Sequence, residues 1–119
     1  MRIEFVLPYP PTVNTYWRRR GSTYFVSKAG ERYRRAVALI VRQQRLKLSL
    51  SGRLVIRIIA EPPDNRRRDL DNILKAPLDA LTHAGLLMDD EQFDEINIVR
   101  GQPVSGGRLE IKITEVGCA

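Results

Sequence analysis

The chain has 119 residues, of which 43% are hydrophobic and 29% charged, a length and balance typical of one folded domain. This composition excludes a disordered or collagen-like chain, and the longest aliphatic run is far below the ~20 residues of a membrane span. The formal net charge is +6, with +12 in residues 1–68 and −6 in residues 69–119, so the basic half predicts a polyanionic partner, above all nucleic acid.

The N-terminal half predicts two strands and a helix. Alternating apolar residues over 3–7 predict a half-buried strand that ends in a proline-rich segment. Residues 8–22 predict a long loop, followed by a short strand over 23–26. Ser27 is a suitable N-cap for an amphipathic helix that extends to about Leu48.

The C-terminal half predicts a second helix and three more strands. Period-two alternation places the strands at residues 53–60, 95–99 and 108–114. The last two strands are predicted to pair as a hairpin, because turn residues separate them. Apolar residues at helical spacing over 70–81 predict a helix that Gly85 ends. Pro77 predicts either a kink or a regular part that starts near Ala76.

The predicted order β-β-α-β-α-β-β gives a single α+β domain over residues 1–119. We expect a mostly antiparallel sheet of four to five strands with two helices on one face. The only cysteine, Cys118, excludes an internal disulfide and a thiolate zinc site. Without a signal-peptide core, the chain is expected to act in the reducing cytoplasm and to have no membrane partner.

The residues that suggest chemistry lie in the stretch Arg-Arg-Arg-Asp-Leu-Asp-Asn over residues 66–72. Asp69 and Asp71 can ligate one cation if the backbone there is extended or just entering a helix. Lys75 follows, and the acidic cluster over 89–95 can fold back to supply a third ligand. Carboxylates together with a phosphate oxygen suit Mg²⁺, which activates water and neutralises charge in phosphodiester hydrolysis.

These residues also have purely structural interpretations. Asp69 or Asp71 can cap a helix, and the acidic cluster over 89–95 can be a solvated turn. The arginine triplet, which consists of Arg66, Arg67 and Arg68, can likewise lie on an exposed loop instead of binding phosphate.

Aromatic residues stand next to a second arginine triplet, which consists of Arg18, Arg19 and Arg20. Tyr16 and Trp17 can stack on exposed bases, or they can pack over the edge of the sheet. The single histidine, His83, lies near the predicted helix end, where it can interact with the helix dipole or take a catalytic role.

With its Asp-Leu-Asp-Asn core, its downstream lysine and its Asp-Asp pair, the sequence resembles the RusA family of Holliday junction resolvases, small homodimeric endonucleases. The resemblance covers nearly the whole chain. It implies that Asp69, Asp71 and Asp90 are catalytic and bind the metal, and that Lys75 is the essential lysine. Because Asp89 is adjacent to Asp90, it remains the alternative third ligand.

The resemblance also implies a substrate and a mechanism. It implies a Mg²⁺-dependent endodeoxyribonuclease, with Mn²⁺ able to substitute and no organic cofactor. A homodimer would cut four-way junctions by paired symmetric hydrolysis, since its twofold symmetry matches that of the substrate. Arg68 matches a basic position expected to contact phosphate, and both arginine triplets are expected to bind DNA. The alternatives are a noncatalytic branched-DNA- or RNA-binding module and a small basic assembly protein of the ribosomal type.

Overall fold

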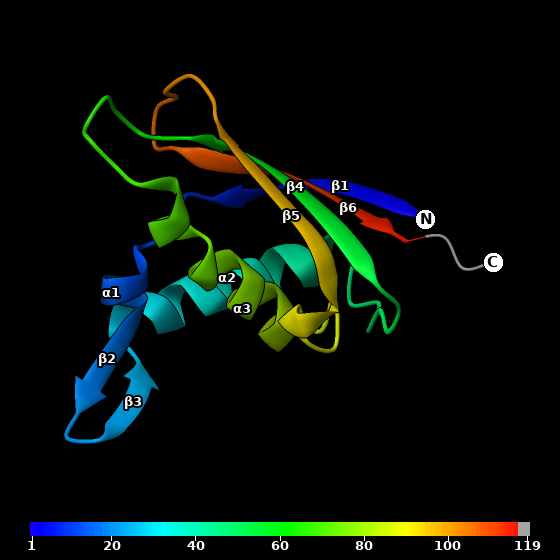
Figure 1. The fold of residues 1–119 in the computed structure, drawn as a ribbon, viewed down its shortest axis with the longest axis horizontal. Helices are drawn as coiled ribbons and strands as arrows, with labels where there is room; N and C mark the ends of the chain where they lie inside the picture. Colours follow the sequence, from blue (N-terminus) through cyan, green and yellow to red (C-terminus); the bar gives the residue numbers. More distant parts are fainter. Residues whose placement is uncertain (117–119) are drawn as a thin grey trace.

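The computed structural model describes residues 1–116, so Cys118 lies outside the described part. Six strands, three α-helices and two short 3₁₀ turns make up the fold (Figure 1). In chain order the elements are β1 (Arg2–Pro8), α1 (Val13–Tyr16), β2 (Trp17–Arg20), β3 (Thr23–Val26), α2 (Lys28–Gln43), β4 (Leu54–Glu61), η1 (Leu70–Ile73), α3 (Lys75–Ala84), η2 (Asp90–Gln92), β5 (Phe93–Arg100) and β6 (Arg108–Glu115).

Four strands form one mixed sheet in the order β1-β6-β4-β5, and β2 pairs with β3 in a separate antiparallel hairpin. In the large sheet β6 is antiparallel to both β1 and β4, whereas β4 and β5 are parallel. The α+β class is therefore confirmed, but the predictions of a mostly antiparallel sheet and of a β5–β6 hairpin are wrong. The chain passes over β4 between these two strands instead. The predicted order β-β-α-β-α-β-β also omits α1 and β2, which lie in the segment predicted as a long loop.

Burial explains why β6 and not β5 takes the inner position. Leu109, Ile111 and Ile113 of β6 are almost completely buried, and the strand is hydrogen-bonded along both edges. β5 exposes 44% of Ile96 and 47% of Val99 and also carries the polar residues Asp94, Glu95, Asn97 and Arg100. Such a strand suits the edge of a sheet. The turn residues alone predict a hairpin between β5 and β6. Burial of the apolar residues of β6 in the middle of the sheet decides the arrangement instead.

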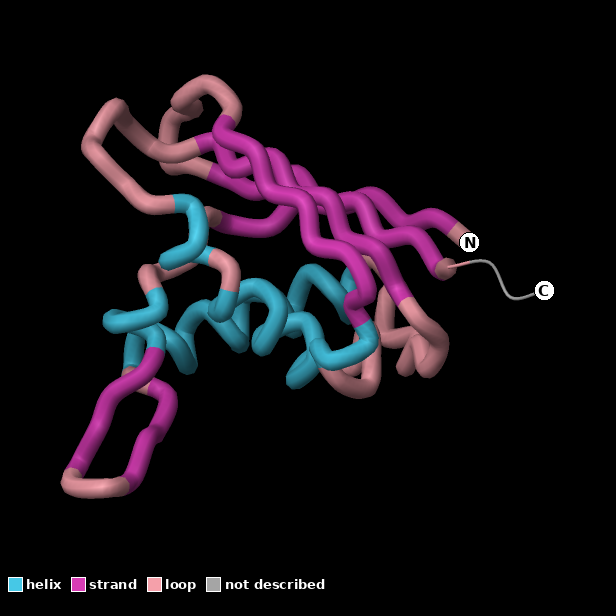
Figure 2. The backbone as a smooth tube through the Cα atoms, in the orientation of Figure 1, coloured by secondary structure: helices cyan, strands magenta, loops and turns pink. Residues whose placement is uncertain are grey.

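The helices α2 and α3 cover one face of the sheet, as predicted (Figure 2). Ser27 caps α2, because its Oγ accepts the backbone N–H of Gly30 at 3.0 Å. Pro77 lies in the first turn of α3, where its missing N–H breaks no helical hydrogen bond. Gly85 ends this helix with a φ of 90°. No helix within residues 1–116 has both the length and the apolarity to cross a membrane.

The β2–β3 hairpin projects away from the helices (Figures 1 and 2), and a polar network fixes its base. Tyr16, at the end of α1, is fully buried, and its hydroxyl donates to Asp79 of α3. Arg34 of α2 donates to the same hydroxyl at 2.9 Å and lies 2.7 Å from the Asp79 carboxylate. Burial and the bond to Asp79 raise the pKa of Tyr16. The three helices are thus joined where the hairpin begins.

Gly30 allows α2 and the hairpin base to approach closely. A Cβ at this position would lie 2.6 Å from Cγ1 of Val26 and 2.8 Å from the backbone oxygen of Tyr16. We expect Gly30→Ala to lower the free energy of unfolding by about 1–3 kcal/mol, because a stiff side chain and a backbone group must move. Urea unfolding followed by circular dichroism measures the loss. Gly52→Ala, where the added Cβ meets nothing within 4 Å, is the control and is expected to change stability little.

Candidate functional site

Asp69 and Asp71 lie at the start of the segment that leads into α3. Asp69 has an extended backbone and occupies the N-cap position of η1, but its side chain makes no capping hydrogen bond. Asp71 lies within η1. Neither carboxylate forms a hydrogen bond or ion pair with any residue in 1–116. The capping interpretation thus receives no support at Asp69, and both carboxylates remain available to a ligand.

Lys75 and Asp90, which come from separate parts of the sequence, are brought together. The Nζ of Lys75, at the first position of α3, lies 3.4 Å from Oδ2 of Asp90 in η2. Both side chains are partly open to solvent. Asp79, one helical turn after Lys75, contacts Arg34 and does not join this pair.

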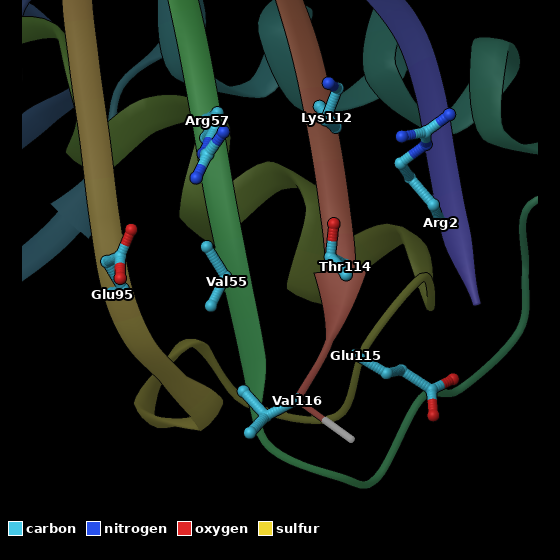
Figure 3. Close-up of a pocket in the computed structure, with 8 residues that line it drawn as sticks. All are labelled: Arg2, Val55, Arg57, Glu95, Lys112, Thr114, Glu115 and Val116. Carbon is cyan, nitrogen blue, oxygen red and sulfur yellow. The ribbon is translucent and has the colours of Figure 1, made fainter.

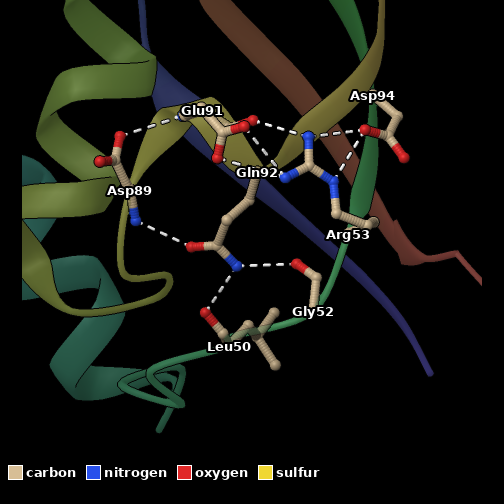
Figure 4. Close-up of polar contacts among 7 residues, drawn as sticks. All are labelled: Leu50, Gly52, Arg53, Asp89, Glu91, Gln92 and Asp94. Carbon is tan, nitrogen blue, oxygen red and sulfur yellow. Dashed lines mark hydrogen bonds and ion pairs between the residues drawn. The ribbon is translucent and has the colours of Figure 1, made fainter.

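Asp89 and Asp90 are adjacent in the sequence, but their carboxylates make different contacts. The Asp89 carboxylate caps η2 by accepting the backbone N–H of Glu91 at 3.0 Å, and this bond lowers its pKa. Asp90 forms the ion pair with Lys75. Further along the same acidic cluster, Arg53 pairs with Glu91 at 3.2 Å and with Asp94 at 2.6 Å (Figure 4).

Gln92 holds this turn in place and was missed by the sequence reasoning. Its side-chain oxygen accepts the backbone N–H of Asp89 at 2.8 Å, and its amide donates to the carbonyls of Leu50 and Gly52, each at 2.8 Å (Figure 4). Gln92 is buried, and both the oxygen and the nitrogen of its side-chain amide form hydrogen bonds. The spacing of Asp89 and Gln92 is that of a capping box, a signal that was present in the sequence.

The three arginines of the first triplet differ in their contacts and in their exposure. Arg68 pairs with Asp64 at 2.8 Å and lies 5.7 Å from the ring centre of Tyr9, and its hydrogen bond lowers the pKa of Asp64. Arg66 is 81% exposed and reaches Asp64 at 3.5 Å. Arg67 is exposed and makes no ion pair within the described range.

A hollow of about 420 Å³ brings part of this loop next to the aspartates. The residues that line it are Thr12, Arg67, Arg68, Asp69, Asn72 and Ile73. Because α1 also packs against η1, the base of the hairpin lies at the same end of the molecule as Asp69 and Asp71. The loop and the hairpin, with one arginine triplet each, therefore flank the predicted carboxylates.

The second arginine triplet lies along β2, where Arg18, Arg19 and Arg20 are exposed. Base stacking by Tyr16 is excluded by its burial, and Trp17 is partly buried against the core with its ring 5.5 Å from that of Tyr16. The exposed aromatics are Tyr24 and Phe25 on β3, which the sequence reasoning did not single out. His83 lies in the last turn of α3 beside Arg34 and Arg35, not beside the aspartates.

The open face of the large sheet holds none of the predicted site residues. It carries a shallow hollow of about 390 Å³ (Figure 3). The residues that line this hollow are Arg2, Val55, Arg57, Glu95, Lys112, Thr114, Glu115 and Val116.

The chemistry of the candidate site fits a hard divalent cation. Asp69 and Asp71 offer uncommitted carboxylate oxygens, and Mg²⁺ is commonly held by one or two carboxylates together with waters and phosphate oxygens. Within residues 1–116 no three His, Cys, Asp or Glu side chains gather closely enough to hold one metal ion. The residues therefore fit a metal that a phosphate of the substrate helps to hold, rather than a preformed three-carboxylate cage.

Comparison with known proteins gives consistent matches. Residues 8–114, which contain every predicted site residue, match the family model described as Endodeoxyribonuclease RusA. The chain is 60% identical over 113 residues to "Crossover junction endodeoxyribonuclease rusA" of Enterobacteria phage HK97, covering 95% of this chain and 94% of the relative. It is 45% identical over 114 residues to the protein of that name from Escherichia coli strain K12, covering 96% and 95%. The relative of that name from Enterobacteria phage 82 is 44% identical, with the same coverage of 96% and 95%.

Proposed function

We propose that this chain, which belongs to the RusA endodeoxyribonuclease family, is a crossover junction endodeoxyribonuclease that resolves four-way DNA junctions by hydrolysing a phosphodiester bond in each of two strands. The contact of Lys75 with Asp90 supports this proposal most directly. It joins two segments 15 positions apart at the start of α3, the helix that Asp69 and Asp71 precede. A lysine that contacts a phosphoryl group can stabilise the negative charge that develops on it.

The residues divide into three roles. Asp69 and Asp71, together with Asp90 once assembly and substrate complete the site, would hold Mg²⁺, or Mn²⁺ in its place, and the bound metal would supply a water of lowered pKa and neutralise charge at phosphorus. Lys75 donates a hydrogen bond to the leaving oxygen or to a non-bridging oxygen as negative charge develops there. Asp90 keeps the ammonium group of Lys75 at the site until substrate arrives.

The arginines bind the DNA backbone in this proposal. The exposed Arg66 and Arg67, together with Arg18, Arg19 and Arg20, neutralise phosphates on either side of the carboxylates. Arg68 contacts phosphate through the part of its guanidinium that Asp64 leaves open.

The active form in this proposal is a homodimer that acts in the cytoplasm. A four-way junction has approximate twofold symmetry, and two symmetry-related sites would cut two strands of like polarity. The absence of a three-carboxylate cluster within residues 1–116 of one chain is compatible with a site that assembly and substrate complete. Light scattering of the purified protein, alone and with junction DNA, tests the dimer.

The test of the activity is cleavage of a labelled four-way junction and of a linear duplex of matching sequence, with Mg²⁺ or with EDTA. We expect paired symmetric nicks in the junction that need Mg²⁺ and are lost in folded Asp71→Asn. Glu4→Gln, an exposed carboxylate on β1, is the matched control and should cleave normally. Junction binding without nicking, over several junction sequences and divalent metals, would instead favour the noncatalytic module.

A further inference from the structure

We infer that the face of the β2–β3 hairpin that carries Phe25 is a nucleotide-binding site, at which the Phe25 ring stacks on the exposed face of a base while Arg18, Lys28 and Arg32 bind the adjoining phosphates. This inference rests on the proposed function and adds to it a means of distinguishing branched from linear DNA. It assigns a role to three residues, Phe25, Lys28 and Arg32, that the cleavage chemistry does not use.

The hairpin separates its aromatic residues onto opposite faces. Neighbouring residues of a strand point to opposite sides, so Tyr24 and Phe25 cannot share a face. Arg18 pairs in register with Phe25, and Arg19 pairs with Tyr24. The Arg20 guanidinium lies 5.8 Å from the ring centre of Phe25. One face of the hairpin therefore combines the Phe25 ring with two arginines.

A cavity of about 450 Å³ opens from this face toward the start of α2. The residues that line it are Arg18, Phe25, Ser27, Lys28, Ala29 and Arg32. Like the hollow beside Asp69, it is open to solvent. An aromatic wall next to three cations matches a nucleotide, which presents a flat base at one end and a phosphate at the other.

The charges of this cavity are not compensated by the protein. Arg18, Lys28 and Arg32 make no ion pair with any residue in the described range, 1–116. No carboxylate lines the cavity, and the nearby Glu31 lines a different hollow with Arg34 and Arg35. A second copy of this positively charged face would be repelled, whereas a polyanion would gain free energy through counterion release. The charge favours nucleic acid over self-association.

The exposure of Phe25 supports base stacking rather than a role in folding. Its side chain is 41% exposed, while Val26, the next residue, packs against the core. In a linear duplex the bases stack on each other and offer no free face. A branch point can present such a face, and stacking of one base on an aromatic side chain increases affinity by about 5- to 100-fold.

The base of the hairpin is anchored beside the segment that carries Asp69 and Asp71. Tyr16 anchors its base to Asp79 and Arg34, and α1 packs against η1. A base engaged at Phe25 would thus fix the strand relative to Asp69 and Asp71. Phe25 is a positioning residue for this reaction and not a catalytic one.

The test is binding of a four-way junction, a matching linear duplex and a single strand in EDTA, so that cleavage cannot occur. We expect Phe25→Leu to weaken junction and single-strand binding by about 5- to 100-fold and to leave duplex binding unchanged, while Phe25→Tyr restores affinity. Quenching of 2-aminopurine placed at the branch point should be lost in the Leu variant. Tyr24→Leu, on the opposite face, is the matched control and should retain both signals.

Substitution of the cations that line the cavity is expected to change the salt dependence of DNA binding. Arg32→Gln and Lys28→Gln should weaken binding to all three DNAs, with the slope of log K against log salt falling by about 0.7 to 0.9 for each phosphate that the variant no longer neutralises. Unchanged binding in both of these variants would contradict the phosphate contacts.

Other outcomes would overturn the inference. These are an equal effect of Phe25→Leu on junction and duplex, equal losses in Tyr24→Leu, or a change of oligomeric state seen by light scattering. Wild-type protein that nicks junctions while Phe25→Leu binds normally refutes this inference alone. Wild-type protein that binds junctions but never nicks them refutes the proposed function, and the binding comparison still decides the role of Phe25.

Discussion

Replacing Asp90 with Asn is expected to lower the rate of junction cleavage by roughly 100- to 1,000-fold, an effect of the size seen when one group that stabilises a transition state is removed. The variant loses a carboxylate that contacts Lys75 at 3.4 Å and that we propose as a metal ligand. Its stability should hardly change, because an ion pair this exposed contributes only about 0–1 kcal/mol. Single-turnover cleavage at saturating enzyme measures the rate.

Asp89→Asn is the matched control for this prediction. Asn caps a helical turn about as well as Asp, so the substitution keeps the bond to the Glu91 N–H and removes only the charge. We expect cleavage close to that of wild type. A severe loss in Asp89→Asn with normal activity in Asp90→Asn would reverse the assignment of the third ligand.

Asp79→Ala is expected to lower the free energy of unfolding by about 2–3 kcal/mol. The substitution leaves the Arg34 guanidinium and the Tyr16 hydroxyl without their shared acceptor in a partly buried setting. Because this network joins the three helices at the base of the hairpin, the hairpin should loosen as well. Urea unfolding measures the first effect, and hydrogen exchange of the amides in β2 and β3 measures the second.

A second aspartate provides the control for Asp79. Asp94 also pairs with an arginine, Arg53, but both side chains are nearly half exposed. Asp94→Ala should therefore cost less than about 1 kcal/mol. Comparable losses of stability in the two variants would mean that burial of the Arg34 pair adds nothing to its strength.

Local patterns predicted the positions of most elements but not their arrangement in the sheet. The alternation of Leu109, Ile111 and Ile113 correctly predicted a strand with one buried face. The pattern does not say which strands lie on either side, and only comparison with the polar, exposed residues of β5 indicates which strand is at the edge. The β2 strand was missed because four consecutive residues, Trp-Arg-Arg-Arg, show no alternation.

The candidate site was predictable as a set of residues but not as a geometry. The spacing of Asp69, Asp71 and Lys75 along one segment was visible in the sequence. Asp90 approaches Lys75 from η2, and the buried amide of Gln92 ties η2 to the loop before β4. Such a tie joins residues about 40 positions apart, and no local pattern encodes it.

The inner position of β6 has a consequence for the biosynthesis of this protein. Within residues 1–116, β1 pairs with no strand other than β6, and β4 is joined to β1 only through β6. While a ribosome is still synthesising residues 108–115, β1 and β4 therefore lack the strand that connects them. The two helices can form as their sequences emerge, but the sheet they cover closes only after residues 108–115 have been made. Long-range pairing of this kind folds slowly and leaves strand edges open, so β1 and β4 keep open edges until β6 is available.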